Sequence, residues 1–396
     1  MLRVTRCLVA AAALAATMLS WPAPASAQST LIRQAASDCR DVAFTYDSEF
    51  SSTTQQLADT LDSLGIRTTW FFLGEQVERY APLVRQIAAR HQIGNHSFTH
   101  PTLSNKTPEQ IRQELNLTEE ALLSATGTSP QPLFRPPYGS WSRTLLEVAE
   151  AEGYPYTVLW SVDPRDWDGP SAAEIRQHVN EHAFPGAIVL FHGRPASTVE
   201  ATRLLVGDLR GRGYQFVTLT ELLGTDRHLR DFGGDTYTVQ PGDAWPQVAA
   251  CHNLSAPRLQ AYTGLADLTA GAVLTMPYRD EAIITVNGRR LAFPVRPRID
   301  LQAGRALAHV RLAESLGATV EWDGTRVHVT KGELHIEITP GQQTALVGGA
   351  PADMLTAARI ENDRLLLPVR FLAEQLGAAV AWDSETWTVS VSTPAP

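Results

Sequence analysis

The residues of this 396-residue chain that could do chemistry stand in five short polar clusters. They are Thr45-Tyr46-Asp47, His96-Ser97-Phe98-Thr99-His100, Arg135-Pro136-Pro137-Tyr138-Gly139, Asp163-Pro164-Arg165-Asp166-Trp167 and Leu190-Phe191-His192. Imidazoles, carboxylates and a guanidinium are groups that transfer protons and stabilise charge during a reaction. His96 and His100 are four residues apart, so on one helical turn both imidazoles could face a single cation. Two unrelated surface histidines are the ordinary alternative.

An apolar segment precedes each cluster, and its composition predicts a β-strand. The predicted strands are Asp41–Tyr46, Gln92–Asn95, Pro132–Arg135, Tyr156–Trp160 and Ala187–Phe191. Amphipathic runs of helical period lie between them, with turn signals at Gly65 and Gly153. These runs include Ser52–Leu64, Glu75–Arg90, Pro108–Thr126 and Ala172–Glu181. A β/α alternation with polar residues at the carboxyl ends of its strands predicts an α/β barrel enzyme, because that end of a barrel carries the active site.

The order and spelling of the clusters resemble the polysaccharide deacetylase family, the NodB-homology or carbohydrate esterase family 4 domain. The resemblance covers residues 38–226, about the length of one domain. It implies a distorted (β/α) barrel and a hydrolase that removes acetyl groups from N-acetylated sugars, acting on carbon–nitrogen bonds other than peptide bonds. Gly94-Asn95 before the two histidines and Pro101 after them complete the family's pattern, which favours metal ligation by His96 and His100.

The resemblance also implies one divalent metal ion, with zinc as the expected identity. The family's third protein ligand is the second acid of a Thr-Phe-Asp-Asp-Gly motif, which here reads Thr45-Tyr46-Asp47-Ser48-Glu49. Ser48 therefore occupies the ligand position, and a neutral hydroxyl is a weak ligand beside a carboxylate. We expect weaker metal binding, with water or Glu49 as possible substitutes.

The resemblance assigns roles to five further residues. Asp47 corresponds to the general base that takes a proton from the attacking water, and Arg135 to the residue that organises it and keeps it ionised. The backbone N–H of Tyr138 corresponds to an oxyanion donor. His192 corresponds to the general acid that protonates the leaving amine, and Asp166 to the carboxylate that orients this imidazole and raises its pKa.

Two apolar residues match substrate-binding positions of the family. Trp167 corresponds to a groove residue and Leu190 to the acetyl pocket, although aromatic and leucine side chains at strand ends mostly belong to a core. Asp163, in the same cluster as Trp167, is better explained as a loop cap than as a catalyst.

The first residues predict the compartment. Arg3 and Arg6 give a basic start, Cys7–Ser20 is apolar, and Ala25-Ser26-Ala27 is a small-residue cleavage signal. The pattern predicts a secretory signal peptide over residues 1–27 and a secreted, cell-wall-associated protein. A membrane anchor is the alternative, but the apolar run is short for a bilayer and no later segment is apolar enough to cross one.

The overall charge and the cysteines restrict the partners and covalent links. The net charge of −9 argues against nucleic acid or anionic membranes as partners.

After the predicted signal peptide the cysteines are Cys39 and Cys251, which fall in different predicted modules. A disulfide between them is possible, and two free thiols are the simpler expectation.

A small module follows a linker at His228–Thr236. The segment Tyr237–Trp245 and the closing Leu274-x-Met276-Pro277 resemble a LysM module, a βααβ fold over residues 236–278 that binds glycans containing N-acetylglucosamine. Thr263 stands where that family often has Asn, so the resemblance supports the fold more than the glycan affinity. A structural spacer is the alternative.

Residues 282–394 contain an internal repeat. Leu312–Ala318 recurs as Leu372–Ala378, and Trp322-Asp323 recurs as Trp382-Asp383. The repeat resembles the copper amine oxidase N-terminal-like domain, an α+β unit that we interpret as a stalk or adhesion domain. Its histidines, His309, His328 and His335, are scattered in the sequence, so no copper is expected.

Two functions of different class are consistent with the whole sequence. The first is a secreted, metal-dependent deacetylase of an N-acetylated cell-wall glycan, with peptidoglycan favoured and chitin-type glycans possible, held on its polymer by the LysM-like module. The second is a weak or inactive relative that only binds glycans, and Ser48 is its support. Hydrolysis of another amide, such as a cyclic ureide, is less compatible with a secreted chain. The sequence makes no prediction about the oligomeric state.

Overall fold

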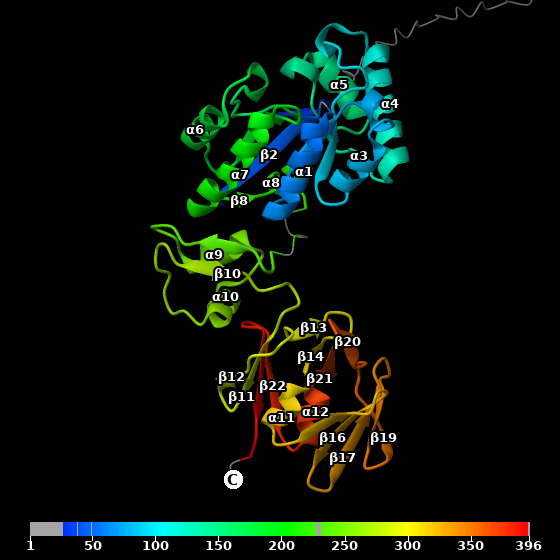
Figure 1. Cartoon of the computed structure of the whole chain (residues 1–396), viewed down its shortest axis with the longest axis vertical. Helices are drawn as coiled ribbons and strands as arrows, with labels where there is room; N and C mark the ends of the chain where they lie inside the picture. Colours follow the sequence, from blue (N-terminus) through cyan, green and yellow to red (C-terminus); the bar gives the residue numbers. More distant parts are fainter. Residues whose placement is uncertain (1–26, 38, 49, 227–229, 231, 395–396) are drawn as a thin grey trace, which may run out of the picture.

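The computed structural model describes residues 27–37, 39–48, 50–226, 230 and 232–394. The predicted signal peptide before Ala27, as well as Glu49 and His228, lies outside the described residues. Figure 1 shows three bodies that follow one another along the long axis: an α/β domain, a small module around α9 and α10, and a β-rich domain at the carboxyl end. Within the described residues, no helix has both the length and the apolar composition needed to cross a membrane.

The first domain is built on an eight-stranded sheet in the order β1-β6-β5-β4-β3-β2-β7, with β8 also paired to β2. Every named pairing in it is parallel. The strands are β1 (Thr30–Ile32), β2 (Asp41–Ser48), β3 (Thr69–Phe72), β4 (Gln92–Asn95), β5 (Leu133–Phe134), β6 (Tyr156–Val158), β7 (Ala187–His192) and β8 (Gln215–Phe216). The mixed α/β fold with a parallel half-barrel confirms the predicted fold class.

Helices connect the strands and cover the sheet (Figure 1). They are α1 (Ser52–Leu64), α2 (Gly74–Val77), α3 (Ala81–Ala88), α4 (Pro108–Thr126), α5 (Arg143–Ala151), α6 (Ala172–His182), α7 (Ala196–Gly211) and α8 (Leu219–Leu222). Capping boxes begin α1 and α4, at Ser51 and Thr107, and left-handed glycines end both helices, so their bounds match the predicted ones.

The prediction of one helix over Glu75–Arg90 is wrong. The structure ends α2 at Val77 and begins a separate helix, α3, at Ala81. Pro82 lies in the first turn of α3, where its missing N–H costs nothing, and it could not continue a helix from α2 without removing a hydrogen bond.

Strand β2 is buried along its whole length and is the centre of the domain. Tyr46 stacks between Trp70 and Phe191, with ring centroids 4.8 Å and 5.4 Å away. Val42, Phe44 and Tyr46 of β2 belong to this aromatic core, whereas Ala43 belongs to a second apolar cluster with Phe71. Packing on both faces holds the strand rigidly, and therefore also Asp47 and Ser48 at its carboxyl end.

The small module has the element order β-α-α-β. Its antiparallel strands β9 (Thr236–Thr238) and β10 (Val273–Thr275) flank α9 (Trp245–Cys251) and α10 (Ala256–Thr263). Tyr237, Val248, Leu259 and Met276 are among the residues of a separate small core.

A disulfide joins Cys39 to Cys251, so the expectation of two free thiols is wrong. The two residues are 212 apart in sequence, and only the docking of the module on the first domain brings their Cα atoms to 5.6 Å. Gln215 of β8 contacts His252 next to the disulfide. Because Cys39 precedes β2 and Gln215 pairs with Asp41, the module docks at the end of β2 opposite to Asp47.

The β-rich domain contains a four-stranded sheet β12-β11-β23-β22, a second one β13-β14-β21-β20, and a five-stranded meander β15 to β19. The helices α11 (Arg311–Ser315) and α12 (Val369–Gln375) share one core with these sheets. The strands are β11 (Ile283–Val286), β12 (Arg289–Arg290), β13 (Arg298–Asp300), β14 (Arg305–His309), β15 (Thr319–Trp322), β16 (Val327–Lys331), β17 (Leu334–Ile338), β18 (Thr344–Val347), β19 (Ala350–Asp353), β20 (Arg359–Glu361), β21 (Arg364–Pro368), β22 (Ala379–Asp383) and β23 (Thr388–Ser392).

Two of its histidines are closer together than the sequence indicates. His328 and His335 lie on the paired strands β16 and β17, with their rings stacked 5.4 Å apart. His328 also contacts Asp323 at 2.9 Å. Within the described ranges, however, no three potential metal ligands of the His, Cys, Asp or Glu type gather at one place.

Candidate active site

The polar residues at the strand ends converge on one edge of the sheet. Asp47 and Ser48 end β2, and His192 ends β7 beside it, with Asp47 and His192 as register partners. His96 directly follows β4, and Arg135 directly follows β5. The backbone N–H of Arg135 donates to the carbonyl of Asn95 at 2.9 Å, which continues the sheet pairing as far as the site.

Arg135 is fully buried and fixes Asp47. Its Nη1 donates to Oδ1 of Asp47 at 2.8 Å, its Nη2 to Oγ1 of Thr45 at 2.9 Å, and its Nε to the carbonyl of Val158 at 3.3 Å. The guanidinium also lies 4.2 Å from the centroid of the Phe71 ring. A buried guanidinium with several acceptors cannot easily turn, so it is a rigid partner for the carboxylate.

The charges around Asp47 keep it ionised. Burial by itself would raise the pKa of Asp47. The positive charges of Arg135, of His192 and of a protonated His96 outweigh this effect, and the pKa of Asp47 lies below its usual value. At neutral pH the guanidinium of Arg135 supplies this effect, because it is always charged.

The imidazole of His96 presents a lone pair toward Asp47. Its Nδ1 donates to the carbonyl of Arg135 at 2.8 Å, which leaves Nε2 as an acceptor 3.4 Å from Oδ2 of Asp47. Burial lowers the pKa of His96 to about 4, so the ring is neutral at pH 7. Two electron-rich atoms that face each other favour a positive charge beside them.

The prediction that His96 and His100 share a helical turn is wrong. Residues 96–100 form a loop in which Ser97 and His100 have φ values of 68° and 62°. The carboxylate of Glu114 accepts from the backbone N–H groups of Phe98 and Thr99 at 2.8 Å, so a side chain replaces helical hydrogen bonds here. The loop still brings the imidazoles of His96 and His100 together, with ring centroids 5.0 Å apart.

Ser48 lies at the position where the family's motif has an acidic ligand. It is buried, and its hydroxyl oxygen has no hydrogen-bond partner in the described part of the chain. Among the described residues no three His, Cys, Asp or Glu side chains form a complete metal site. The two neighbouring imidazoles of His96 and His100 could supply two ligands to a divalent cation, and Ser48 offers a neutral hydroxyl in place of the third, acidic ligand.

Asp166 holds His192 by two hydrogen bonds. Oδ1 lies 2.7 Å from Nδ1 of His192, and Oδ2 accepts from its backbone N–H at 2.8 Å. The hydroxyl of Thr198 donates to Oδ2 at 2.6 Å. Asp166 is completely buried, so the carboxylate fixes the imidazole with Nδ1 protonated and directs proton transfer to Nε2.

The remaining predicted residues divide into rim and core. Tyr138 has a left-handed φ of 59° and is 69% exposed, and the centroid of its ring lies 4.7 Å from that of His100. Trp167 is also exposed, whereas Leu190 is buried in β7. Asp163 accepts from the backbone N–H of Arg165 at 2.9 Å and is the expected loop cap.

Sequence reasoning missed three residues of this region. Thr45 belongs to the Thr45-Tyr46-Asp47 cluster, but its contact with Arg135 depends on the order of the strands in the sheet. Thr198 lies in α7 and carries no local signal of its contact with Asp166. Trp141, an exposed indole, could have been found from its position two residues after the Arg-Pro-Pro-Tyr-Gly cluster.

This edge of the sheet defines a hydrolase-type site in a parallel half-barrel, with a fixed carboxylate, a fixed imidazole and a pair of histidines. Residues 34–157 match the family model described as polysaccharide deacetylase, and residues 285–391 match the copper amine oxidase N-terminal domain. A peptidoglycan-N-acetylglucosamine deacetylase of Bacillus cereus is 34% identical over 196 residues, which are 47% of this chain and 70% of that protein. The chain belongs to the polysaccharide deacetylase family, which confirms the predicted class of enzyme.

Two further matches cover smaller shares of the proteins concerned. The peptidoglycan-N-acetylglucosamine deacetylase PgdA of Listeria monocytogenes is 35% identical over 185 residues, or 46% of this chain and 39% of that protein. The crystal structure of a carbohydrate esterase family 4 pseudoenzyme from Bacillus anthracis is 28% identical with a TM-score of 0.47, and the match covers 50% of this chain and 69% of that one.

Proposed function

We propose that the first domain removes N-acetyl groups from a cell-wall polysaccharide, with N-acetylglucosamine of peptidoglycan as the favoured substrate. The observation that carries this proposal is the pairing of two fixed proton-transfer groups. Asp47, held by Arg135, and His192, held by Asp166, are register partners on adjacent strands. A base and an acid side by side are what amide hydrolysis requires.

The residues of the chain divide the reaction between them. Asp47 is ionised and accepts the proton of the attacking water, while Arg135 holds its carboxylate in place. His192 gives a proton to the departing amine nitrogen, and Asp166 keeps its ring in the required tautomer. The backbone N–H of Tyr138 stabilises the developing oxyanion. His96 and His100 would hold a divalent ion, which when bound polarises the acetyl carbonyl and acidifies water.

The β-α-α-β module is our proposed glycan anchor of the LysM type. It docks at the end of β2 opposite to Asp47, and the disulfide between Cys39 and Cys251 fixes it there. It would therefore bind a different segment of the polymer from the one in the active site, and it would raise the substrate concentration near the active site. The disulfide also supports a secreted protein, because such bonds persist mainly in oxidising compartments.

One observation favours a second function, that of a weak or inactive glycan-binding relative. The buried Ser48 hydroxyl replaces an acidic ligand and has no hydrogen-bond partner among the described residues. The intact Asp47–Arg135 and His192–Asp166 pairs favour the enzyme.

The two functions are separated by measuring bound metal and released acetate on the same sample. We expect the purified protein to bind a divalent ion and to release acetate from N-acetylglucosamine oligomers and from peptidoglycan. His100→Ala should abolish metal binding and acetate release together. A protein that binds these glycans but binds no metal and releases no acetate would support the second function. A metal-free His100→Ala variant with full activity would refute the mechanism.

A further inference from the structure

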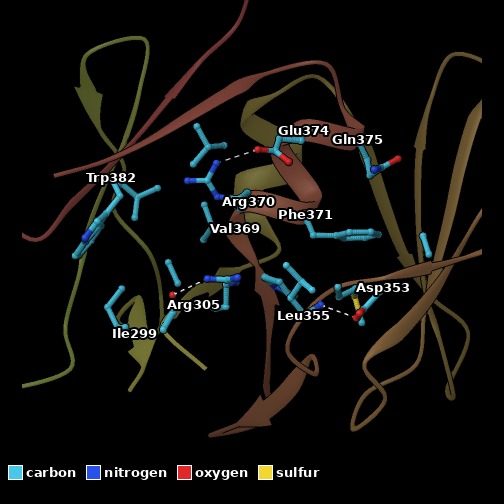
Figure 2. Close-up of a pocket in the computed structure, with 17 residues that line it drawn as sticks. Ile299, Arg305, Asp353, Leu355, Val369, Arg370, Phe371, Glu374, Gln375 and Trp382 are labelled. Atoms are coloured by element: carbon cyan, nitrogen blue, oxygen red, sulfur yellow. Dashed lines mark hydrogen bonds and ion pairs between the residues drawn. The ribbon is translucent and has the colours of Figure 1, made fainter. Parts of the chain in front are cut away.

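The β-rich domain contains a cavity of about 450 Å³ that the proposed deacetylase function does not use. Figure 2 shows it between the helix α12 and strands of different sheets. Its wall comes from four parts of the domain: β13 with the start of β14, the turn after β19, helix α12, and the strands β22 and β23. The volume lies in the range of small-ligand sites, about 300–1,000 Å³.

Most of the cavity wall is apolar. The apolar lining residues are Ile299, Ala306, Ala352, Met354, Leu355, Pro368, Val369, Phe371, Val380, Trp382 and Val389. Two of them remain exposed to solvent, Trp382 at 40% and Leu355 at 51%. Large apolar side chains that line a cavity and remain accessible offer contact area to an apolar ligand group.

The backbone holds Leu355 in an unusual conformation. Its φ of 62° lies in the left-handed region, which a leucine rarely adopts. The carboxylate of Asp353 accepts from the backbone N–H of Leu355 at 2.8 Å and stabilises this turn (Figure 2). The turn therefore keeps an apolar side chain at the cavity instead of burying it in the core.

Arg305 is the arginine of the cavity wall that has no carboxylate partner in the described part of the chain. Within the described ranges its Nε is buried without a hydrogen-bond partner, and its Nη1 donates to the neighbouring carbonyl of Gly304 at 3.3 Å. No carboxylate of the described residues lies within ion-pair distance of it. Arg370, the other arginine of the cavity wall, is already paired with Glu374 at 3.1 Å. A guanidinium with unused donors is suited to bind a carboxylate through two parallel hydrogen bonds.

We propose that this cavity binds a short acylated peptide with an apolar end and a free terminal carboxylate. Its apolar part would contact Trp382 and Leu355, and its carboxylate would pair with Arg305. A neutral sugar ring fits less well, because it has no carboxylate to pair with Arg305 and its several hydroxyl groups would lose hydrogen bonds to water against an apolar wall. The peptides of a cell-wall polymer have the required chemistry, but the proposal does not depend on the deacetylase function.

The internal repeat supplies a matched control. Trp322 occupies in the first repeat the position that Trp382 occupies in the second, and it is 52% exposed. Trp322 does not line the cavity, and neither does Arg311, an exposed arginine of the same domain. Trp322→Ala and Arg311→Met therefore reproduce the chemical changes of Trp382→Ala and Arg305→Met away from the proposed site.

The test is calorimetric titration of the full-length protein with diacetyl-lysyl-alanyl-alanine and with the C-terminal amide of the same peptide. We expect the free acid to bind at least about tenfold more tightly than the amide, since a charge-assisted pair with Arg305 is lost. Arg305→Met should weaken the acid about tenfold and remove its advantage over the amide. Trp382→Ala should weaken both peptides, and the two control variants should change neither.

Three results would overturn the proposal. The first is that the acid does not bind at millimolar concentration, and the second is that the unaltered protein binds acid and amide equally well. The third is that an N-acetylglucosamine oligomer binds the protein and that Trp382→Ala weakens this binding. The acid-to-amide comparison needs no variant, so the test stands even if Arg305→Met does not fold.

Discussion

Ser48→Asp tests directly whether this position faces the metal. Ser48 is 1% exposed, and its hydroxyl has no hydrogen-bond partner in the described residues. The guanidinium of Arg135 is already paired with the carboxylate of Asp47, the residue next to Ser48. A new carboxylate here would therefore be buried without a partner when no metal is bound, which costs about 3–5 kcal/mol of unfolding free energy.

A bound ion should return this stability to the variant. An ion present at a thousandfold excess over its dissociation constant stabilises the folded state by about 4 kcal/mol. In chelator we expect Ser48→Asp to be less stable than the unaltered protein by about 3–5 kcal/mol at pH 7. With zinc we expect most of that loss to disappear, whereas the unaltered protein, with two imidazole ligands, should gain less.

The assay is urea unfolding of both proteins in chelator and in zinc, with Ser48→Asn as the matched control. Asparagine has nearly the same shape as aspartate but no charge, so in chelator it should show only the cost of a larger uncharged side chain, and in zinc it should show no large gain. Equal stability of Ser48→Asp and the unaltered protein in chelator would show that the new carboxylate reaches water. Equal gains of all three proteins in zinc would show that residue 48 does not face the ion.

Three further results follow from the same geometry. His192→Ala should lose much of its activity on amides and less on activated esters, whose leaving groups need no proton, whereas Asp47→Asn should fail on both; equal losses of His192→Ala on both substrates would exclude it as the general acid. A chain ended near Thr225 that also carries Cys39→Ser should still cleave small acetylated sugars but should bind insoluble cell wall less than the full chain in a sedimentation assay; complete sedimentation would exclude the β-α-α-β module as the anchor. Burial lowers the pKa of His91 from its ordinary 6.5 to about 4. As the pH falls, this histidine therefore takes up a proton in the unfolded chain before it does so in the folded one. The free energy of unfolding should decrease by up to about 3 kcal/mol between pH 6.5 and 4. His91→Gln should remove that part of the pH dependence in denaturant unfolding, and an unchanged pH profile would contradict it.

Local signals were enough to predict much of the first domain. The helices Ser52–Leu64 and Pro108–Thr126 have the predicted bounds, because capping residues and terminal glycines define helix ends within a few residues of sequence. The polar clusters also lie at strand ends as predicted, since an apolar segment and the polar residues after it are adjacent in the chain. The helix Glu75–Arg90 was predicted wrongly because an internal proline outweighed its amphipathic pattern.

The sequence by itself determined the α/β alternation, the family and the residue types that the site could use. Only the tertiary structure decided that Cys39 pairs with Cys251, that His96 and His100 meet across a loop, and that Trp382 lines a cavity while its repeat partner Trp322 does not. Each of these depends on contacts between segments far apart in the chain. Periodicity and capping report the conformation of neighbouring residues, whereas the packing of distant elements determines which side chains finally meet.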